Sequence, residues 1–165
     1  MRWIHGATIL ATIAVAACSV DEPPTAFAPV ADTTAASLWS HLQAANYQSW
    51  RMWPGKTARY TGTEPHGMLL TTYVNDRAYN ALTSAAATMP AGAVIVKENY
   101  MLNGSYDAAT VMHRVPGYDL QNGDWFWAKY DANGVAAVAG RVAMCSGCHA
   151  AARQRDFLMT PLPQN

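Results

Sequence analysis

The centre of the chain is a succession of apolar and β-branched runs separated by turn residues. These runs predict strands at residues 68–74, 93–98, 110–115 and 124–130. Pro116-Gly117 and Asn133-Gly134 follow two of them and are typical of tight turns. Because the strands follow one another without crossover helices, the pattern favours an antiparallel sheet.

Apolar residues at helical spacing predict helices around these strands. Thr33 or Thr34 is expected to cap a helix that runs to about Trp50. A short helix is expected over residues 75–87, and a helical stretch over residues 150–157. The predicted fold is therefore α+β: an antiparallel β-sheet with flanking helices on one of its sides.

The N-terminal residues have the pattern of an exported protein. Residues 1–17 combine Arg2 with a short apolar run and small residues, which is typical of a secretory signal peptide and too short for a spanning helix. Cys18 follows Val15-Ala16-Ala17, so the segment resembles a bacterial lipobox in which the cysteine is lipidated; an ordinary signal without lipidation is the alternative. Ser19 after the cysteine favours the outer membrane.

Length and composition predict one domain in the rest of the chain, and the signal-like N-terminus predicts that this domain is periplasmic. Residues 18–35, rich in Pro, Ala and Thr, are expected to form a flexible tether, and residues 36–165 a single domain. The 165 residues include 11 Lys+Arg and 11 Asp+Glu. No basic patch emerges, so nucleic acid is not an expected partner, and the membrane is expected to be contacted through the lipid anchor only.

The run Cys145-Ser146-Gly147-Cys148-His149 carries the strongest chemical signal. C-x-x-C-H is the attachment signature of c-type haem: two thiols at this spacing can bond to one haem, and the histidine then lies under the iron as proximal ligand. The alternatives are a redox cysteine pair or half of a zinc site, but no second ligand pair at matching spacing is present. With Cys18 assigned to lipid, none of the three cysteines remains for a disulfide.

Three separate blocks of the sequence resemble the cytochrome P-460 family. They are Pro90 to Glu98, Pro116 to Asp119 with Asn122 to Trp127, and the late C-x-x-C-H run followed by Asp156-Phe157. The resemblance covers about residues 36–160. It implies an antiparallel sheet with flanking helices around one haem c, often in a homodimer. The family includes hydroxylamine-oxidising cytochromes and the related cytochromes c′-beta, which bind nitric oxide.

The resemblance also directs attention to Lys97. In the hydroxylamine-oxidising members, a lysine in this Val-Lys-Glu block bonds covalently to the haem macrocycle. A lysine in an apolar site loses its proton easily and becomes nucleophilic. On a strand, Lys97 shares a face with Ala93 and Ile95, whereas Glu98 faces the opposite side and is a weak candidate for proton transfer. The alternative is that Lys97 lies at the strand end and reaches water or pairs with a carboxylate.

The resemblance implies an open sixth position at the iron. An electron carrier fills this position with Met or His, for which the candidates are Met68, Met101, Met112, Met159, His66 and His113. His113 is expected to be a satisfied core histidine, and His66, in a turn-like Pro-His-Gly setting, a surface or structural residue. Leu70 falls where some hydroxylamine-oxidising members carry a basic residue. The resemblance therefore implies a pocket that is more apolar than in those members, and an apolar pocket favours gas binding.

Three functions therefore remain open. The first is oxidation of hydroxylamine or a related nitrogen oxide, with electrons passed to a partner cytochrome; a Lys97 cross-link favours it. The second is capture of nitric oxide without turnover, which an uncross-linked open haem favours. The third is simple electron transfer, which a sixth protein ligand favours.

Overall fold

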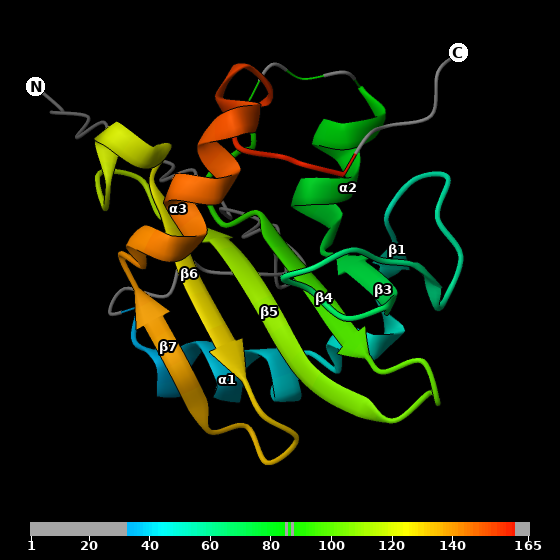
Figure 1. The fold of residues 1–165 in the computed structure, drawn as a ribbon. Coiled ribbons are helices and arrows are strands. Elements are labelled where there is room, and N and C mark those ends of the chain that lie inside the picture. The colour runs from blue at the N-terminus through cyan, green and yellow to red at the C-terminus, as the bar shows by residue number, and fades with distance from the viewer. Residues whose placement is uncertain (1–32, 85, 87, 161–165) are drawn as a thin grey trace, which may run out of the picture.

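The computed structural model describes residues 33–84, 86 and 88–160. Within these residues, seven strands form one antiparallel sheet in the order β1-β3-β4-β5-β6-β7, with β2 also paired to β3 (Figure 1). The strands are β1 (Arg51–Met52), β2 (Tyr60–Thr61), β3 (Leu69–Val74), β4 (Val94–Tyr100), β5 (Tyr106–Arg114), β6 (Trp125–Tyr130) and β7 (Ala136–Gly140). The predicted α+β fold with an antiparallel sheet is confirmed.

The helices of the described part are short. The α-helices are α1 (Ala35–Ala44), α2 (Asp76–Thr83) and α3 (Ala143–His149), and the 3-10 helices are η1 (Tyr47–Ser49), η2 (Leu120–Asn122) and η3 (Ala150–Arg155). Thr34 caps α1, as predicted, with its hydroxyl accepting a hydrogen bond from the Ser37 backbone N–H at 3.1 Å. The helix stops before the predicted end at Trp50, because Asn46 adopts a left-handed φ of 45°.

Several elements differ from the prediction. The strands β1 and β2 have two residues each, too few for a periodic pattern, and β7 is an Ala- and Gly-rich segment without strand propensity apart from Val138. The helix expected over residues 150–157 begins earlier, since α3 covers the C-x-x-C-H run itself and η3 continues from it. The signal peptide, Cys18 and the tether up to residue 32 lie outside the described residues.

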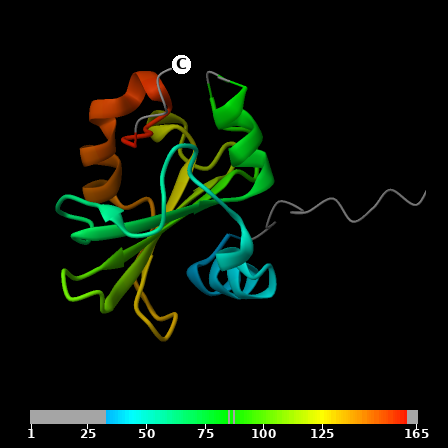
Figure 2. The ribbon, with the colours of Figure 1, turned by 90° about the vertical axis from the view of Figure 1, so that its right-hand side faces the viewer.

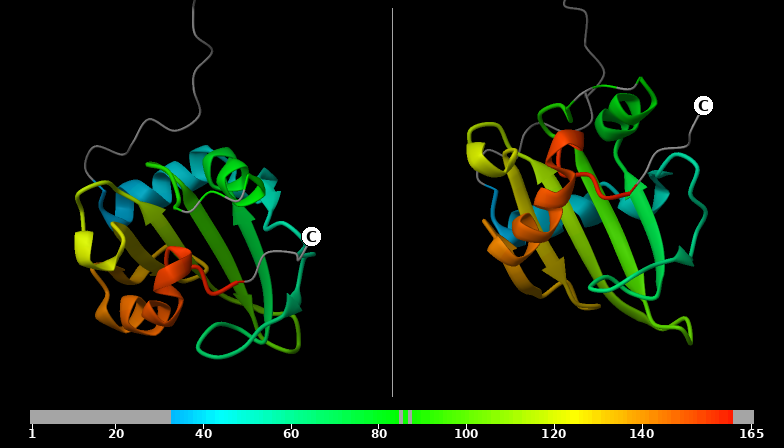
Figure 3. Two further views of the ribbon diagram at one scale, coloured as in Figure 1. Left: turned by 90° about the horizontal axis from the view of Figure 1, so that it is seen from above. Right: turned by 45° about the horizontal axis from the view of Figure 1, so that its top comes forward.

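Helices cover both faces of the sheet, so the prediction of helices on one side is wrong. The helices α1 and α3 lie on opposite faces (Figures 2 and 3). On the α1 face, Leu38 and Leu42 pack with Val94 and Phe126 in one core cluster. The apolar residues of α2 join the second cluster, on the α3 face. The reason is that the central strands are apolar on both faces, and each face requires a cover.

Alternation along β4 sends neighbouring residues to opposite faces. Ile95 belongs to the core cluster on the α3 face, whereas Val94 and Val96 belong to the cluster beneath α1. Glu98 lies on the α1 face with 1% of its surface exposed. Its carboxylate accepts hydrogen bonds from Tyr47 Oη at 2.9 Å, Gln48 Nε2 at 2.7 Å and Tyr100 Oη at 2.5 Å. Tyr47 and Gln48 belong to η1, so their two hydrogen bonds tie β4 to that helix on the side opposite to Lys97, whereas Tyr100 belongs to β4 itself.

The predicted orientation of Glu98, away from Lys97, is thereby confirmed. Across the described residues, no helix is long and apolar enough to cross a membrane.

Candidate functional site

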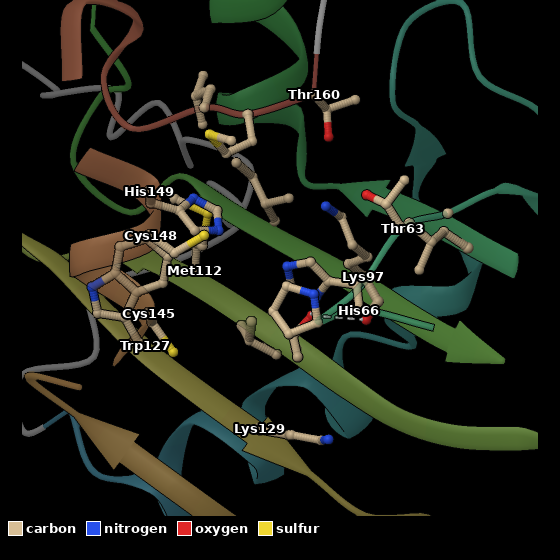
Figure 4. Close-up of a pocket in the computed structure, with 18 of the residues that line it drawn as sticks. Thr63, His66, Lys97, Met112, Trp127, Lys129, Cys145, Cys148, His149 and Thr160 are labelled. Carbon is tan, nitrogen blue, oxygen red and sulfur yellow. Dashed lines mark hydrogen bonds between the residues drawn. The ribbon is translucent and has the colours of Figure 1, made fainter. Parts of the chain in front are cut away.

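A cavity of about 470 Å³ lies between the α3 face of the sheet, α3 itself and the loop between β2 and β3 (Figure 4). The strands contribute Leu70, Ile95, Lys97, Thr110, Met112, Trp127 and Lys129, the loop contributes residues 62–66, and α3 contributes Cys145, Cys148 and His149. Its volume falls in the range of cofactor and small-molecule sites.

The C-x-x-C-H residues open together onto this cavity. Cys145 and Cys148 are three positions apart in α3, which places them on the same side of the helix. Cys145 is half-buried and Cys148 exposed, and both are free thiols that line the cavity. Burial, and then the neighbouring Cys148, raises the pKa of the Cys145 thiol. The structure thus brings Cys145, Cys148 and His149 to the wall of one cavity.

His149 is held in a defined orientation and protonation state. It is 8% exposed, and its Nδ1 donates a hydrogen bond to the Phe157 carbonyl at 2.7 Å. Trp127 packs against its ring with centroids 4.7 Å apart. With the proton on Nδ1, the lone pair of Nε2 is available on the cavity side, which is the arrangement of a metal-ligating histidine.

The Phe157 carbonyl is placed by Asp156, which is 8% exposed. Its carboxylate accepts hydrogen bonds from Met89 N at 2.6 Å and from Arg114 Nη1 at 2.7 Å. Its backbone carbonyl accepts from Trp125 Nε1 at 3.0 Å. Asp156 and Phe157 both have left-handed φ angles, of 53° and 66°, and this turn brings the Phe157 carbonyl back to His149.

Replacing Asp156 by Asn is expected to lower the free energy of unfolding by about 3 kcal/mol, because Arg114, whose side chain is 16% exposed, loses its counter-ion. Asn tolerates the left-handed backbone at this position, so the change in stability reports the removed charge and not backbone strain. Urea unfolding of the haem-loaded protein measures it. Asp107→Asn is the matched control: the exposed Asp107–Lys129 pair, at 3.8 Å, is expected to contribute less than about 1 kcal/mol. Equal effects of the two variants would contradict the assignment.

Lys97 enters the cavity from β4 (Figure 4). It is half-buried, and burial lowers its pKa to about 8. In the described residues it is part of no ion pair. The alternative of a lysine paired with a carboxylate therefore finds no support in the described structure.

The structure separates the candidates for the sixth iron position. Met112, Met159 and His66 line the cavity, as does Leu70. Met68 and Met101 are 36% and 53% exposed and lie outside the lining. His113 is buried, as expected, in the core away from the cavity; however, neither of its ring nitrogens has a hydrogen-bond partner among the described residues, so it is not the satisfied histidine predicted.

Of the two alternatives for His66, a surface or a structural residue, the first is wrong, since the loop folds it over the cavity. Burial, and next Lys97, lowers the pKa of His66 to about 4, so its imidazole is neutral. Two further lysines, Lys56 and Lys129, line the cavity and were not among the predicted site residues. Period-two alternation from Trp127 could have identified Lys129; Lys56 lies in an irregular segment that offers no such signal.

The donor set of the cavity fits haem c. It provides two thiols for thioether bonds, an imidazole with an available Nε2, an aromatic wall in Trp127 and lysine ammonium groups for the propionates. Within the described part of the chain, no group of three or more His, Cys, Asp or Glu side chains could hold a bare metal ion. These residues are therefore suited to hold a large planar group through thioether bonds rather than an isolated ion.

Comparison with protein families agrees with this geometry. The family model described as Cytochrome P460 matches residues 44–160. The chain belongs to the cytochrome P460 family. It is therefore a haem c protein, and the predicted family, haem and iron are confirmed. No curated protein matches the chain.

The match places the cavity inside the family's domain. Residues 44–160 include every residue named above as lining the cavity, from Lys56 to Met159. The matched residues contain all seven strands, α2, α3 and the three 3-10 helices, and they begin at the last residue of α1.

Proposed function

We propose that this protein oxidises hydroxylamine or a closely related nitrogen oxide and passes the electrons to another cytochrome. In this proposal Cys145 and Cys148 carry the haem, and His149 is its proximal ligand. The haem iron supplies the electron-accepting centre and an exchangeable coordination position. Oxidation of hydroxylamine to nitric oxide releases three electrons and three protons. The electrons go to the partner cytochrome and the protons to solvent.

Lys97 is the observation that carries this proposal. Its amine points into the cavity, lacks a carboxylate partner in the described structure and has a pKa of about 8. At neutral pH a fraction of the Lys97 amine is therefore unprotonated. The unprotonated amine is the nucleophile that a bond to the haem macrocycle requires. The bond replaces one N–H of Lys97 and one C–H of the macrocycle, and the two electrons and two protons removed reduce a peroxide to water.

The surroundings of the amine favour this reaction. Thr72 and Thr110 flank Lys97 on the neighbouring strands in the β-ladder. Neither can form an ion pair that would hold the amine protonated. The ladder with β3 and β5 places Lys97 on the cavity face, and the hydrogen bonds from Tyr47 and Gln48 to Glu98 hold β4 from the opposite face.

Binding of nitric oxide without turnover is the second candidate. Leu70 lies in the cavity lining where a basic residue would assist a charged or polar substrate, and Ile95, Met112 and Trp127 extend the apolar wall. An apolar pocket suits a small neutral gas better than hydroxylamine. This function needs no cross-link at Lys97.

We also infer that the protein works in the periplasm, anchored to the outer membrane through a lipidated Cys18. The signal-like residues 1–17 and the Ala-Ala-Cys sequence support this inference. Attachment of haem to C-x-x-C-H motifs outside the cytoplasm agrees with it. A homodimer is proposed from the family alone.

The test is turnover by the wild-type protein matured in a periplasm with haem-attachment machinery. Hydroxylamine is supplied with an artificial electron acceptor, and reduction of the acceptor is followed. Sustained reduction that depends on hydroxylamine is expected. Stoichiometric binding of nitric oxide with no reduction of the acceptor would overturn the oxidase proposal and favour the second candidate.

A further inference from the structure

Tyr47 and Tyr100 place their hydroxyl groups on the two oxygens of one buried carboxylate. Tyr47 Oη donates to Glu98 Oε1 at 2.9 Å, and Tyr100 Oη donates to Glu98 Oε2 at 2.5 Å. Glu98 is 1% exposed and belongs to no ion pair within the described residues. A buried anion that is held by neutral donors alone is costly to keep, and the chemistry of the cavity uses neither phenol.

This arrangement has the parts that oxidation of a tyrosine requires. Burial, and next the charge of Glu98, raises the pKa of Tyr47, and burial, and next the hydrogen bond to Glu98, raises the pKa of Tyr100. Both phenols are therefore protonated at neutral pH. Since an oxidised phenol is a strong acid, its electron and its proton leave together. The Glu98 carboxylate lies within hydrogen-bond distance of both phenols and can accept the proton.

Two other buried aromatic side chains lack such an acceptor. Tyr130 Oη donates to the Ala35 backbone carbonyl at 2.8 Å, and a carbonyl is not a base. Trp127 packs against His149, yet its Nε1 has no hydrogen-bond partner among the described residues. Proximity to the haem ligand therefore favours oxidation of Trp127, whereas a proton acceptor favours the tyrosine pair, Tyr47 and Tyr100.

Strand β4 connects the tyrosine pair to the cavity. Lys97 lines the cavity, and Glu98 is the next residue on the strand, with its side chain on the opposite face. One peptide bond thus separates a residue of the cavity wall from the residue that binds both phenols. Gln48, which also donates to Glu98, is exposed, and Tyr100 is half-buried, so a proton accepted by Glu98 has a short way to solvent.

We propose that Tyr47 and Tyr100, with Glu98 as proton acceptor, form a redox site that supplies electrons when peroxide reacts at the haem and no nitrogen substrate is bound. Peroxide gains two electrons and two protons, its O–O bond breaks, and two water molecules form. Each tyrosine loses one electron and its phenolic proton and becomes a neutral radical. The phenolic protons pass in turn to Glu98 and to solvent, and two protons from solvent enter at the cavity. The inference rests on haem c and is independent of hydroxylamine turnover.

The experiment treats the ferric, haem-loaded protein with one equivalent of hydrogen peroxide, without hydroxylamine, and freezes it for electron paramagnetic resonance. A tyrosyl radical is expected in the wild type, identified by a narrower signal in protein that contains ring-deuterated tyrosine. The double variant Tyr47→Phe/Tyr100→Phe is expected to lose this signal, and excess peroxide is expected to bleach its haem several-fold faster. Glu98→Gln, which keeps both phenols and removes the proton acceptor, is expected to lose the signal too.

Tyr130→Phe is the matched control, because it removes a buried phenol from the same face of the sheet without changing a contact of Glu98. It is expected to keep the wild-type signal and bleaching rate. The double variant retains both aromatic rings, and its haem content and circular dichroism check its fold. A wild type without a protein radical, a radical on tryptophan, or an unchanged tyrosyl signal in the double variant would each overturn the assignment. Since no hydroxylamine is present, these outcomes are distinct from failure of the proposed turnover.

Discussion

Replacing Cys145 and Cys148 together by Ser is expected to leave no covalently attached haem. A hydroxyl is too poor a nucleophile to add to a vinyl group under conditions in which a thiol reacts. Because the chain has three cysteines and Cys18 lies far from the site in sequence, no other thiol of the cavity can substitute. Haem staining after denaturing electrophoresis and the intact mass of the polypeptide measure the loss. Replacing Cys148 alone is expected to leave at most one thioether bond.

Gly147→Ala is the matched control for this experiment. Gly147 lies between the two cysteines in α3, and a Cβ there meets no atom within 4 Å. In a helix, alanine is more favourable than glycine by about 1 kcal/mol. Normal haem attachment is therefore expected in this variant. Retention of two thioether bonds in the Cys148→Ser protein would refute the central assignment of the C-x-x-C-H run.

Period-two patterning was sufficient to predict the four central strands, β3 to β6, and the faces of their side chains. Trp125 and Trp127 lie in the core cluster on the α3 face, with Phe126 on the other, as the alternation indicates. The cover of each face was less predictable. A strand buried on both faces and a strand buried on one face differ only in the residues between the apolar positions. A continuous apolar run therefore does not indicate which elements cover the two faces of the sheet.

In the candidate site, too, the residues of a local motif could be predicted, whereas a residue placed by contacts distant in sequence could not. Cys145, Cys148 and His149 form a local motif, so their assembly could be predicted from spacing. His66 could not be placed, because its position over the cavity depends on Gly67 docking against Asn99 and Tyr100, which are 32 and 33 positions away. A turn-like sequence indicates that the chain reverses but does not indicate what it then covers.

Replacing Lys97 by Ala is expected to change the haem spectrum and to reduce hydroxylamine oxidation by about a hundredfold or more. The cross-linked macrocycle absorbs in a broad, red-shifted Soret band in the reduced state. The variant is expected to show the sharper band of an ordinary c-type haem. Mass spectrometry of haem-bearing peptides gives an independent measure: a peptide containing Lys97 is expected to remain with the haem in wild type only.

Lys129→Ala is the matched control, because it removes another lysine from the cavity wall while leaving β4 unchanged. It is expected to retain the red-shifted band. The pKa of about 8 for Lys97 adds a pH dependence. Deprotonation forms the nucleophile, so peroxide-driven cross-linking of uncross-linked, haem-loaded protein should accelerate between roughly pH 7 and 9 and then level off. A wild-type spectrum identical to that of Lys97→Ala would exclude the cross-link. Nitric oxide binding in the apolar pocket around Leu70 would then be the favoured function.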